Sequence, residues 1–127
     1  SSKKILTNFA KHIDFEFDII IDDASHNLRD ILITLPILFK KLKKSGIYII
    51  EDMDQFSTFK NLNPSNEKNT PKKILEHIRD KKYFESNFLT KEEKSYLINH
   101  IKEINIEKGN MLINGTNCSD IAFIEKK

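Results

Sequence analysis

The sequence contains no tryptophan, only one cysteine and only three glycines, and the scarcity of cysteine and glycine excludes several features. The single cysteine, Cys118, rules out an internal disulfide and fits a reducing compartment. We expect Cys118 to be a small buried residue rather than a nucleophile, because no activating group surrounds it in the sequence. None of the glycines follows a first strand, and no Gly-rich phosphate loop, dinucleotide turn or nucleophile elbow is present. A nucleotide-like cofactor would find no Gly-rich turn in this sequence.

Long apolar runs and an excess of one charge are also absent. No apolar run reaches the ~18 residues that span a bilayer, and the first residues have amphipathic spacing rather than the apolar stretch of a signal peptide. The 21 Lys and Arg nearly balance the 19 Asp and Glu, which leaves a net charge of +2. The concentrated basic face of a nucleic-acid-binding protein is not indicated. We therefore expect a soluble cytoplasmic protein without a nucleic-acid or membrane partner.

The first half of the sequence has the layout of a parallel βαβ unit. Runs of β-branched and aromatic residues at 17–22 and at 47 to 50 or 51 are typical of strands. Between them, apolar residues recur at helical spacing over 27–44, and Gly46 stands where a left-handed helix cap is wanted. Pro36 is expected to bend this helix or divide it in two.

Flanking elements extend this unit. Apolar spacing predicts a helix over 3–13, and Thr70 followed by proline is a typical helix start. Thr90 opens a capping box for a helix that should end near His100. Alternating residues over 101–126 then predict antiparallel strands. The length suits one domain, so residues 1–127 are expected to form a single α/β domain.

Acidic residues follow both predicted strands: Asp22 and Asp23 after the first, Glu51 and Asp52 after the second. The carboxyl ends of parallel strands face the ligand crevice, so these residues should converge at one edge. Four carboxylates there would repel one another unless a cation lay between them, and oxygen ligands without cysteine favour magnesium, calcium or manganese. Strand alternation allows two or three of them to reach a shared ion. The alternative is that they only cap helices and form turns.

His26 lies three residues after Asp23, on the turn that leads into the predicted helix. An imidazole titrates near neutral pH, so at this place it could accept a proton from a substrate hydroxyl. The alternative is a structural or merely exposed histidine. His12, His77 and His100 lie on predicted helices without an acidic cluster, and we expect them to be surface or helix-end residues.

With these residues in place, the segments FDIIIDDASH and IYIIEDM and the helix between them resemble the second half of class I S-adenosylmethionine-dependent methyltransferases. More narrowly, they are similar to the metal-dependent sugar O-methyltransferases of macrolide biosynthesis, of the mycinamicin and macrocin type. The resemblance covers about residues 15–53. Ala24 and Ser45 replace glycines of the family pattern, and the segment after position 53 carries little of the family's aromatic substrate region.

The resemblance implies roles for particular residues. Asp23, Glu51 and Asp52 match the family's magnesium ligands, and His26 matches its general base. The implied reaction transfers a methyl group from S-adenosylmethionine to a sugar or another hydroxylated small molecule. In it, the metal lowers the pKa of the acceptor hydroxyl, His26 removes the proton, and the oxygen attacks the methyl group.

The resemblance also implies a partial Rossmann-like sheet with helices on both faces. Its strands would be the family's strands four to seven, with parallel strands followed by a terminal antiparallel pair. Residues 1–127 would then be the C-terminal part of a larger methyltransferase domain. Because the family's cofactor-binding turn lies upstream of the position of Ser1, the cofactor-binding residues are expected there. We expect this chain alone to be inactive and not to bind S-adenosylmethionine appreciably.

Two other functions compete with this interpretation. One is a non-catalytic methyltransferase-like module that needs a partner chain to complete its sheet, and a homo-oligomer is compatible with the sequence. The other is a phosphoacceptor signalling domain, which also carries an acidic pair after an apolar strand. That domain needs an acceptor aspartate and a lysine at later strand ends, and the strand that ends at Glu51 and Asp52 supplies neither cleanly.

Overall fold

The computed structural model describes residues 2–127. Over this range the helices are α1 (Ser2–Lys11), α2 (Leu28–Phe39), α3 (Pro71–Arg79) and α4 (Lys91–His100). The strands are β1 (Phe17–Asp22), β2 (Leu42–Ile50), β3 (Ile101–Glu107), β4 (Leu112–Ile113), β5 (Thr116–Asn117) and β6 (Ile121–Lys126). The polar segment between β2 and α3 contains two short 3-10 turns, η1 (Gln55–Ser57) and η2 (Lys60–Leu62).

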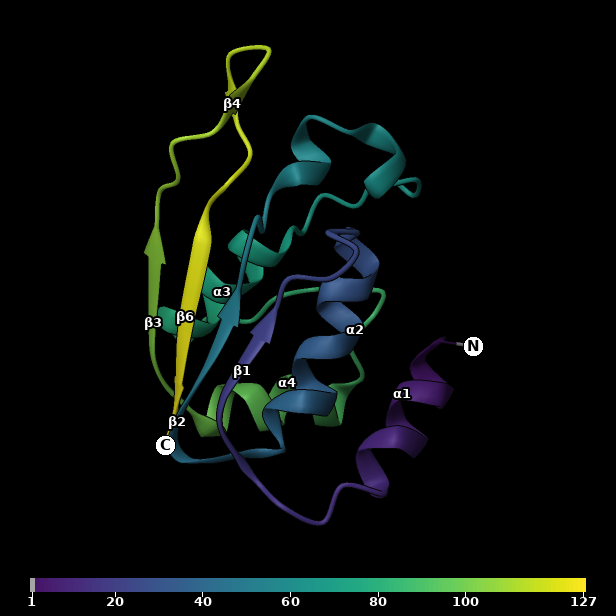
Figure 1. Cartoon of the computed structure of the whole chain (residues 1–127), viewed down its shortest axis with the longest axis vertical. Helices are drawn as coiled ribbons and strands as arrows, with labels where there is room; N and C mark the ends of the chain where they lie inside the picture. Colours follow the sequence, from purple (N-terminus) through teal and green to yellow (C-terminus); the bar gives the residue numbers. More distant parts are fainter. Residues whose placement is uncertain (1) are drawn as a thin grey trace.

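Four strands form the main sheet in the order β1-β2-β6-β3 (Figure 1). β1 and β2 are parallel, whereas β6 runs antiparallel to both of its neighbours, β2 and β3. β4 and β5 form a separate small hairpin that extends from the end of the β3–β6 pair. The α/β class is therefore confirmed, with a parallel pair followed by a terminal antiparallel pair.

α2 begins where the sequence predicts but ends earlier. The Asn27 side chain caps the helix by accepting a hydrogen bond from the Arg29 N–H at 3.0 Å. The helix runs unbroken through Pro36 and ends at Phe39 rather than near residue 44. Pro36 is buried, so its ring packs in the core of the domain. Of the two expectations for this proline, division of the helix is wrong, and a bend stays a prediction.

Gly46 lies within β2, so its expected role as a helix cap is also wrong. A Cβ atom at Gly46 would lie 2.8 Å from the Lys43 carbonyl oxygen and 3.0 Å from that of Asp18 on β1. The glycine is therefore needed for the close approach of two backbones. The neighbouring Ser45 takes the left-handed conformation, with φ of 64°, at the position where the family pattern has a glycine.

The two faces of the sheet differ sharply in exposure. One face packs against the helices and forms the core with the buried residues Tyr48, Ile50, Ile104, Ala122 and Ile124. On the other face, Ile19 and Ile21 are 56% and 58% exposed, and Ile47 and Phe123 are also exposed. Within residues 2–127, the helices lie on one side of the sheet (Figure 1). The expectation of helices on both faces is therefore wrong for the described part of the chain.

The expectation that Cys118 is buried agrees with the structure. Cys118 is fully buried, and burial, followed by the negative charges of Asp54 and Asp52, raises the pKa of its thiol. A thiol with a raised pKa is a poor nucleophile, which fits a packing role. Among the described helices, none has the length and apolar character needed to cross a membrane.

Candidate metal and acid–base site

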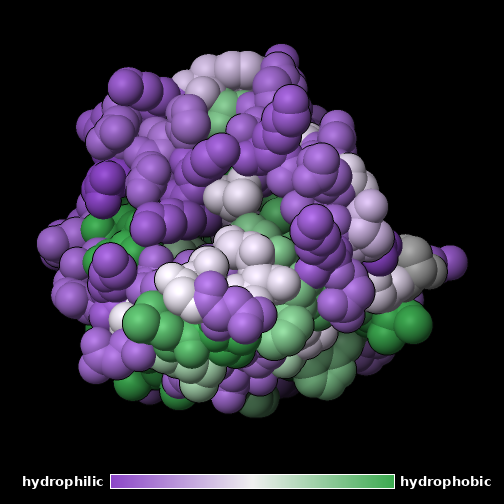
Figure 2. All heavy atoms as spheres, turned by 90° about the horizontal axis from the view of Figure 1, so that it is seen from above, coloured by the Kyte–Doolittle hydropathy of each residue, from purple (hydrophilic) through white to green (hydrophobic). Residues whose placement is uncertain are grey.

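The candidate site lies where β1 and β2 finish side by side. Asp22, the last residue of β1, is in register with Ile50, the last residue of β2. The pairing extends one step further, because the N–H of Glu51 donates to the Asp22 carbonyl at 3.0 Å. Figure 2 shows the molecule from this end, where hydrophilic side chains predominate. The acidic residues predicted at this edge therefore follow strand ends that lie side by side.

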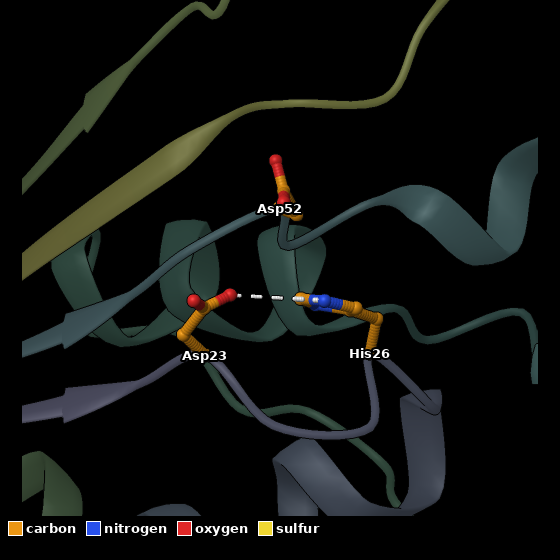
Figure 3. A group of neighbouring side chains, drawn as sticks. All are labelled: Asp23, His26 and Asp52. Atoms are coloured by element: carbon orange, nitrogen blue, oxygen red, sulfur yellow. Dashed lines mark ion pairs between the residues drawn. The ribbon is translucent and has the colours of Figure 1, made fainter.

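Three of the predicted site residues meet at this edge. Asp23, His26 and Asp52 each offer one ligand atom, and these atoms all lie within 4.8 Å of one another. Asp23 and His26 come from the turn between β1 and α2 and point toward each other, with 3.7 Å between Oδ1 and Nε2 (Figure 3). Asp52 reaches the cluster from the segment after β2. The side chain of Asp23 is 55% exposed and that of His26 is 21% exposed, so a ligand can approach.

Two members of this cluster have a strained backbone. His26 has φ of 54° and Asp52 has φ of 46°, in the left-handed region that residues with a side chain usually avoid. Each such conformation costs on the order of 1–2 kcal/mol. Residues in strained conformations persist where the surrounding structure holds them, and they gather at functional sites. Here the strain accompanies the two turns that bring both side chains to the cluster.

The turn that carries His26 is held by local hydrogen bonds. The Ser25 hydroxyl donates to the Asp30 carboxylate at 2.8 Å, and it accepts a hydrogen bond from the Asn27 N–H at 3.3 Å. Asn27 in turn caps α2, so the segment around His26 is fixed to the first turn of the helix. The helix start therefore determines where the imidazole lies.

Asp22 and Glu51 lie outside the cluster. The Asp22 carboxylate accepts a hydrogen bond from the Tyr48 hydroxyl at 3.3 Å. Burial raises the pKa of Asp22, and this hydrogen bond opposes the increase. The pKa of Tyr48 is raised well above its usual range, mainly by burial. Glu51 is half-buried and does not belong to the group around His26. Its role as a metal ligand stays a prediction.

Sequence reasoning missed a buried carboxylate near the segment after β2, that of Asp120, the residue that precedes β6. Its side chain is 5% exposed and accepts a hydrogen bond from the Lys72 ammonium at 3.2 Å. The Asp120 N–H donates to the Asp54 carboxylate at 3.2 Å, and burial raises the pKa of Asp54. No local signal marks Asp120, because it follows a turn-rich segment far along the chain from the acidic strand ends.

The donor set fits a hard divalent cation. Oxygen ligands on opposite sides of an octahedral magnesium ion lie about 4.2 Å apart, twice the ~2.1 Å bond length, which is similar to the spread of this cluster. Two carboxylates with several waters form an ordinary magnesium site. An imidazole is a poorer magnesium ligand than a carboxylate, so His26 is better suited to proton transfer beside the ion.

The comparisons with known proteins bear on the fold. No family model matches the sequence, and no curated protein matches it. Among solved structures, the chain is similar to MycE, a methyltransferase from the mycinamycin biosynthetic pathway, in complex with Mg, S-adenosylhomocysteine and mycinamycin VI. That match has a TM-score of 0.64 at 23% identity and covers 98% of this chain. A second MycE structure, with Mg and S-adenosylhomocysteine, matches with a TM-score of 0.62 at 21% identity.

The chain spans 29% of the length of the MycE chain in the first of these structures. At this level of identity, the likeness concerns the fold and leaves the chemistry to be argued from the residues. The resemblance to methyltransferases that the strand ends and the intervening helix predict is confirmed for the fold. In fold, this chain is similar to part of an S-adenosylmethionine-dependent methyltransferase.

Proposed function

We propose that this chain carries the acceptor and metal side of a magnesium-dependent O-methyltransferase that uses S-adenosylmethionine. Its acceptor would be a sugar or another hydroxylated small molecule. The observation that carries the proposal is the convergence of Asp23, His26 and Asp52 at the carboxyl edge of a parallel strand pair. The structural likeness to MycE, which was solved with Mg and S-adenosylhomocysteine, supports the choice of both cofactors.

Each residue of the site has a chemical task in this proposal. Asp23 and Asp52 would hold a magnesium ion, whose charge would lower the pKa of an acceptor hydroxyl, and the family resemblance implies Glu51 as a further ligand. His26 takes the hydroxyl proton, and the nearby Asp23 carboxylate stabilises the imidazolium that forms. S-adenosylmethionine, held by residues outside this chain, would supply the methyl group, and its carbon–sulfur bond would break as the acceptor oxygen bonds to the methyl carbon. The protein mainly aligns and deprotonates, because the sulfonium is already a strong electrophile.

We also propose that residues 1–127 form the C-terminal part of a larger methyltransferase domain. The strands of this chain would then be equivalent to strands four to seven of the methyltransferase sheet. Two features support this. β1 is an edge strand, and the adjoining sheet face exposes Ile19 and Ile21. An open edge beside exposed apolar residues is a pairing liability unless further structure covers it. The cofactor-binding residues would lie upstream, so calorimetric titration of this chain alone should detect no micromolar binding of S-adenosylmethionine.

The reaction is tested on the complete protein. We expect S-adenosylhomocysteine to form when S-adenosylmethionine and a glycosylated acceptor are supplied, with mycinamycin VI as the first acceptor to try. Turnover should stop when a chelator removes the metal and return when magnesium is added. Undiminished turnover in the presence of the chelator would rule out the metal role.

Binding of Mn²⁺, followed by electron paramagnetic resonance, tests the site without knowledge of the acceptor. Mn²⁺ accepts the same oxygen ligands as magnesium. We expect the unaltered protein to bind it and a double variant, Asp23→Ala with Asp52→Ala, to lose it. Equal binding by both proteins would leave the two carboxylates with only a capping or turn role.

A second candidate function is a non-catalytic module that pairs with another chain through β1. The same open edge favours it. Sedimentation separates the two candidates, because a module should form a stable dimer or hetero-complex, whereas a part of a larger domain should aggregate or fold poorly alone. A location in the cytoplasm and the absence of nucleic-acid and membrane partners belong to the main proposal and are tested by fractionation of cells.

A further inference from the structure

We propose that Asp120 is a positioning residue for Asp52, which it holds in place from the position that precedes β6. This inference rests on the proposed function, since it concerns how one of the expected metal ligands is kept at the cluster. Asp120 itself does not belong to the group formed by Asp23, His26 and Asp52. Its effect on the site would therefore pass through the backbone of the segment after β2.

The backbone is tied down on both sides of Asp52. The N–H of Glu51, the residue before it, donates to the Asp22 carbonyl of β1 at 3.0 Å. The N–H of Met53, the residue after it, donates to the Asp120 carbonyl at 3.0 Å. Asp52 thus lies between two anchors, one at the end of β1 and one at the residue that precedes β6. Its left-handed conformation, with φ of 46°, is kept only while both anchors hold.

The second anchor is itself fixed by the Asp120 carboxylate. Oδ2 accepts from the Lys72 ammonium of α3 at 3.2 Å. Oδ1 accepts from the Asn117 amide at 2.9 Å and from the Gly109 N–H at 3.4 Å. The Asp120 N–H donates to the Asp54 carboxylate at 3.2 Å, which adds a second link to the segment after β2. Lys72, Asn117 and Gly109 therefore fix the Asp120 side chain, and the Asp120 backbone in turn anchors the segment that carries Asp52.

A buried carboxylate with this many hydrogen-bond partners holds the segments around it in fixed positions. Because the Asp120 carboxylate is almost enclosed, it stays fixed only when its lone pairs are satisfied. Asn117 and Gly109 supply those donors to Asp120. Groups that orient a metal ligand without touching the metal typically alter metal affinity by 10–100-fold when they are changed.

The experiment measures the dissociation constant for Mn²⁺ by electron paramagnetic resonance on the complete protein. In Asp120→Asn, the new amide group would face Lys72 with a donor, so the anchor loosens and the dissociation constant should rise about tenfold. Adding Lys72→Gln to this variant lets two neutral amides pair, and affinity should return toward that of the unaltered protein. Lys72→Met removes the cation that pairs with Asp120 and, because Lys72 is half-exposed, should disturb the fold little. It should also weaken Mn²⁺ binding.

Leu97→Ala serves as the control, because Leu97 is fully buried in α4 and lies outside this network. It should lower the melting temperature while leaving Mn²⁺ affinity unchanged. Unchanged affinity in both Asp120→Asn and Lys72→Met, with normal binding by the unaltered protein, would overturn the positioning role alone. Absence of Asp52-dependent Mn²⁺ binding in the unaltered protein would overturn the proposed function and this inference together.

Discussion

Each of the two strand ends carries two acidic residues, and the two members of each pair behave differently. The first members, Asp22 and Glu51, still belong to the pairing of β1 with β2 through the hydrogen bond from the Glu51 N–H. The second members, Asp23 and Asp52, begin the turns and meet at His26. In each pair, therefore, the first residue belongs to the sheet and the next residue belongs to the candidate site.

The environments of the two kinds of acid differ accordingly. Asp22 is partly buried against the Tyr48 hydroxyl, and burial raises its pKa. Asp23 is 55% exposed and faces an imidazole. A carboxylate can serve a cation only where it keeps its charge and remains accessible. The comparison therefore supports the proposal that Asp23 and Asp52 bind the metal, whereas Asp22 contributes to the scaffold through its contact with Tyr48.

The largest expected effect concerns His26, which lies beside both Asp23 and Asp52. Replacing His26 with Ala should lower kcat by roughly 10²–10⁴-fold, the range for loss of a general base, while Mn²⁺ affinity stays nearly constant. Steady-state kinetics and Mn²⁺ titration on the same variant separate the two quantities. His12→Ala, at the exposed end of α1, is the matched control and should change neither. A large loss of Mn²⁺ affinity in His26→Ala would show that the imidazole is a ligand instead.

A smaller effect tests whether Glu51 and Asp52, the acidic pair after β2, have different roles. Asp52→Asn should weaken Mn²⁺ binding by about 100-fold, at or above the upper end of changes seen for residues that only orient a ligand. Glu51→Gln should weaken it by less than about tenfold if Glu51 stays outside the cluster as the structure places it. Titration of both variants gives the ratio. Equal losses would show that the Glu51 side chain turns to join the ion, as the family resemblance implies.

Much of the fold could be predicted because its signals are local. β1 covers residues 17–22 as its apolar run predicts, and α4 begins after Thr90, whose hydroxyl accepts from the Glu93 N–H. The site could also be predicted in outline, since parallel strand ends must share an edge. Asp23, His26 and Asp52 accordingly meet where the sequence indicates.

The failures share a long-range cause. Gly46 looks like a helix cap in the sequence, but it is needed because the Asp18 backbone on β1 comes close. Asp120 has no recognisable motif, and its importance arises from Lys72 and Asp54, which lie far away in the chain. Neither contact leaves a pattern within a window of ten residues, so periodicity and capping rules cannot find it.

The smallest expected effect tests whether Asp22 belongs to the scaffold. Tyr48→Phe removes the hydroxyl that donates to Asp22 over 3.3 Å, a long contact, so the free energy of unfolding at pH 7 should fall by only about 1 kcal/mol. Losing this donor raises the pKa of Asp22 further, so the charged form becomes more costly in the folded state. The difference between variant and unaltered protein should then shrink as the pH falls and Asp22 takes up a proton in both.

Urea unfolding between about pH 4, near the ordinary pKa of an aspartate, and pH 7 measures this difference. Tyr83→Phe is the control, because Tyr83 is an exposed tyrosine that also donates to a carboxylate, that of Glu85. The control should cost less, since water replaces the lost partner of an exposed group at little expense. Mn²⁺ affinity should be the same in both variants. If Tyr48→Phe instead weakened Mn²⁺ binding as strongly as Asp52→Asn, Asp22 would be part of the site, and the two members of each acidic pair would share one function.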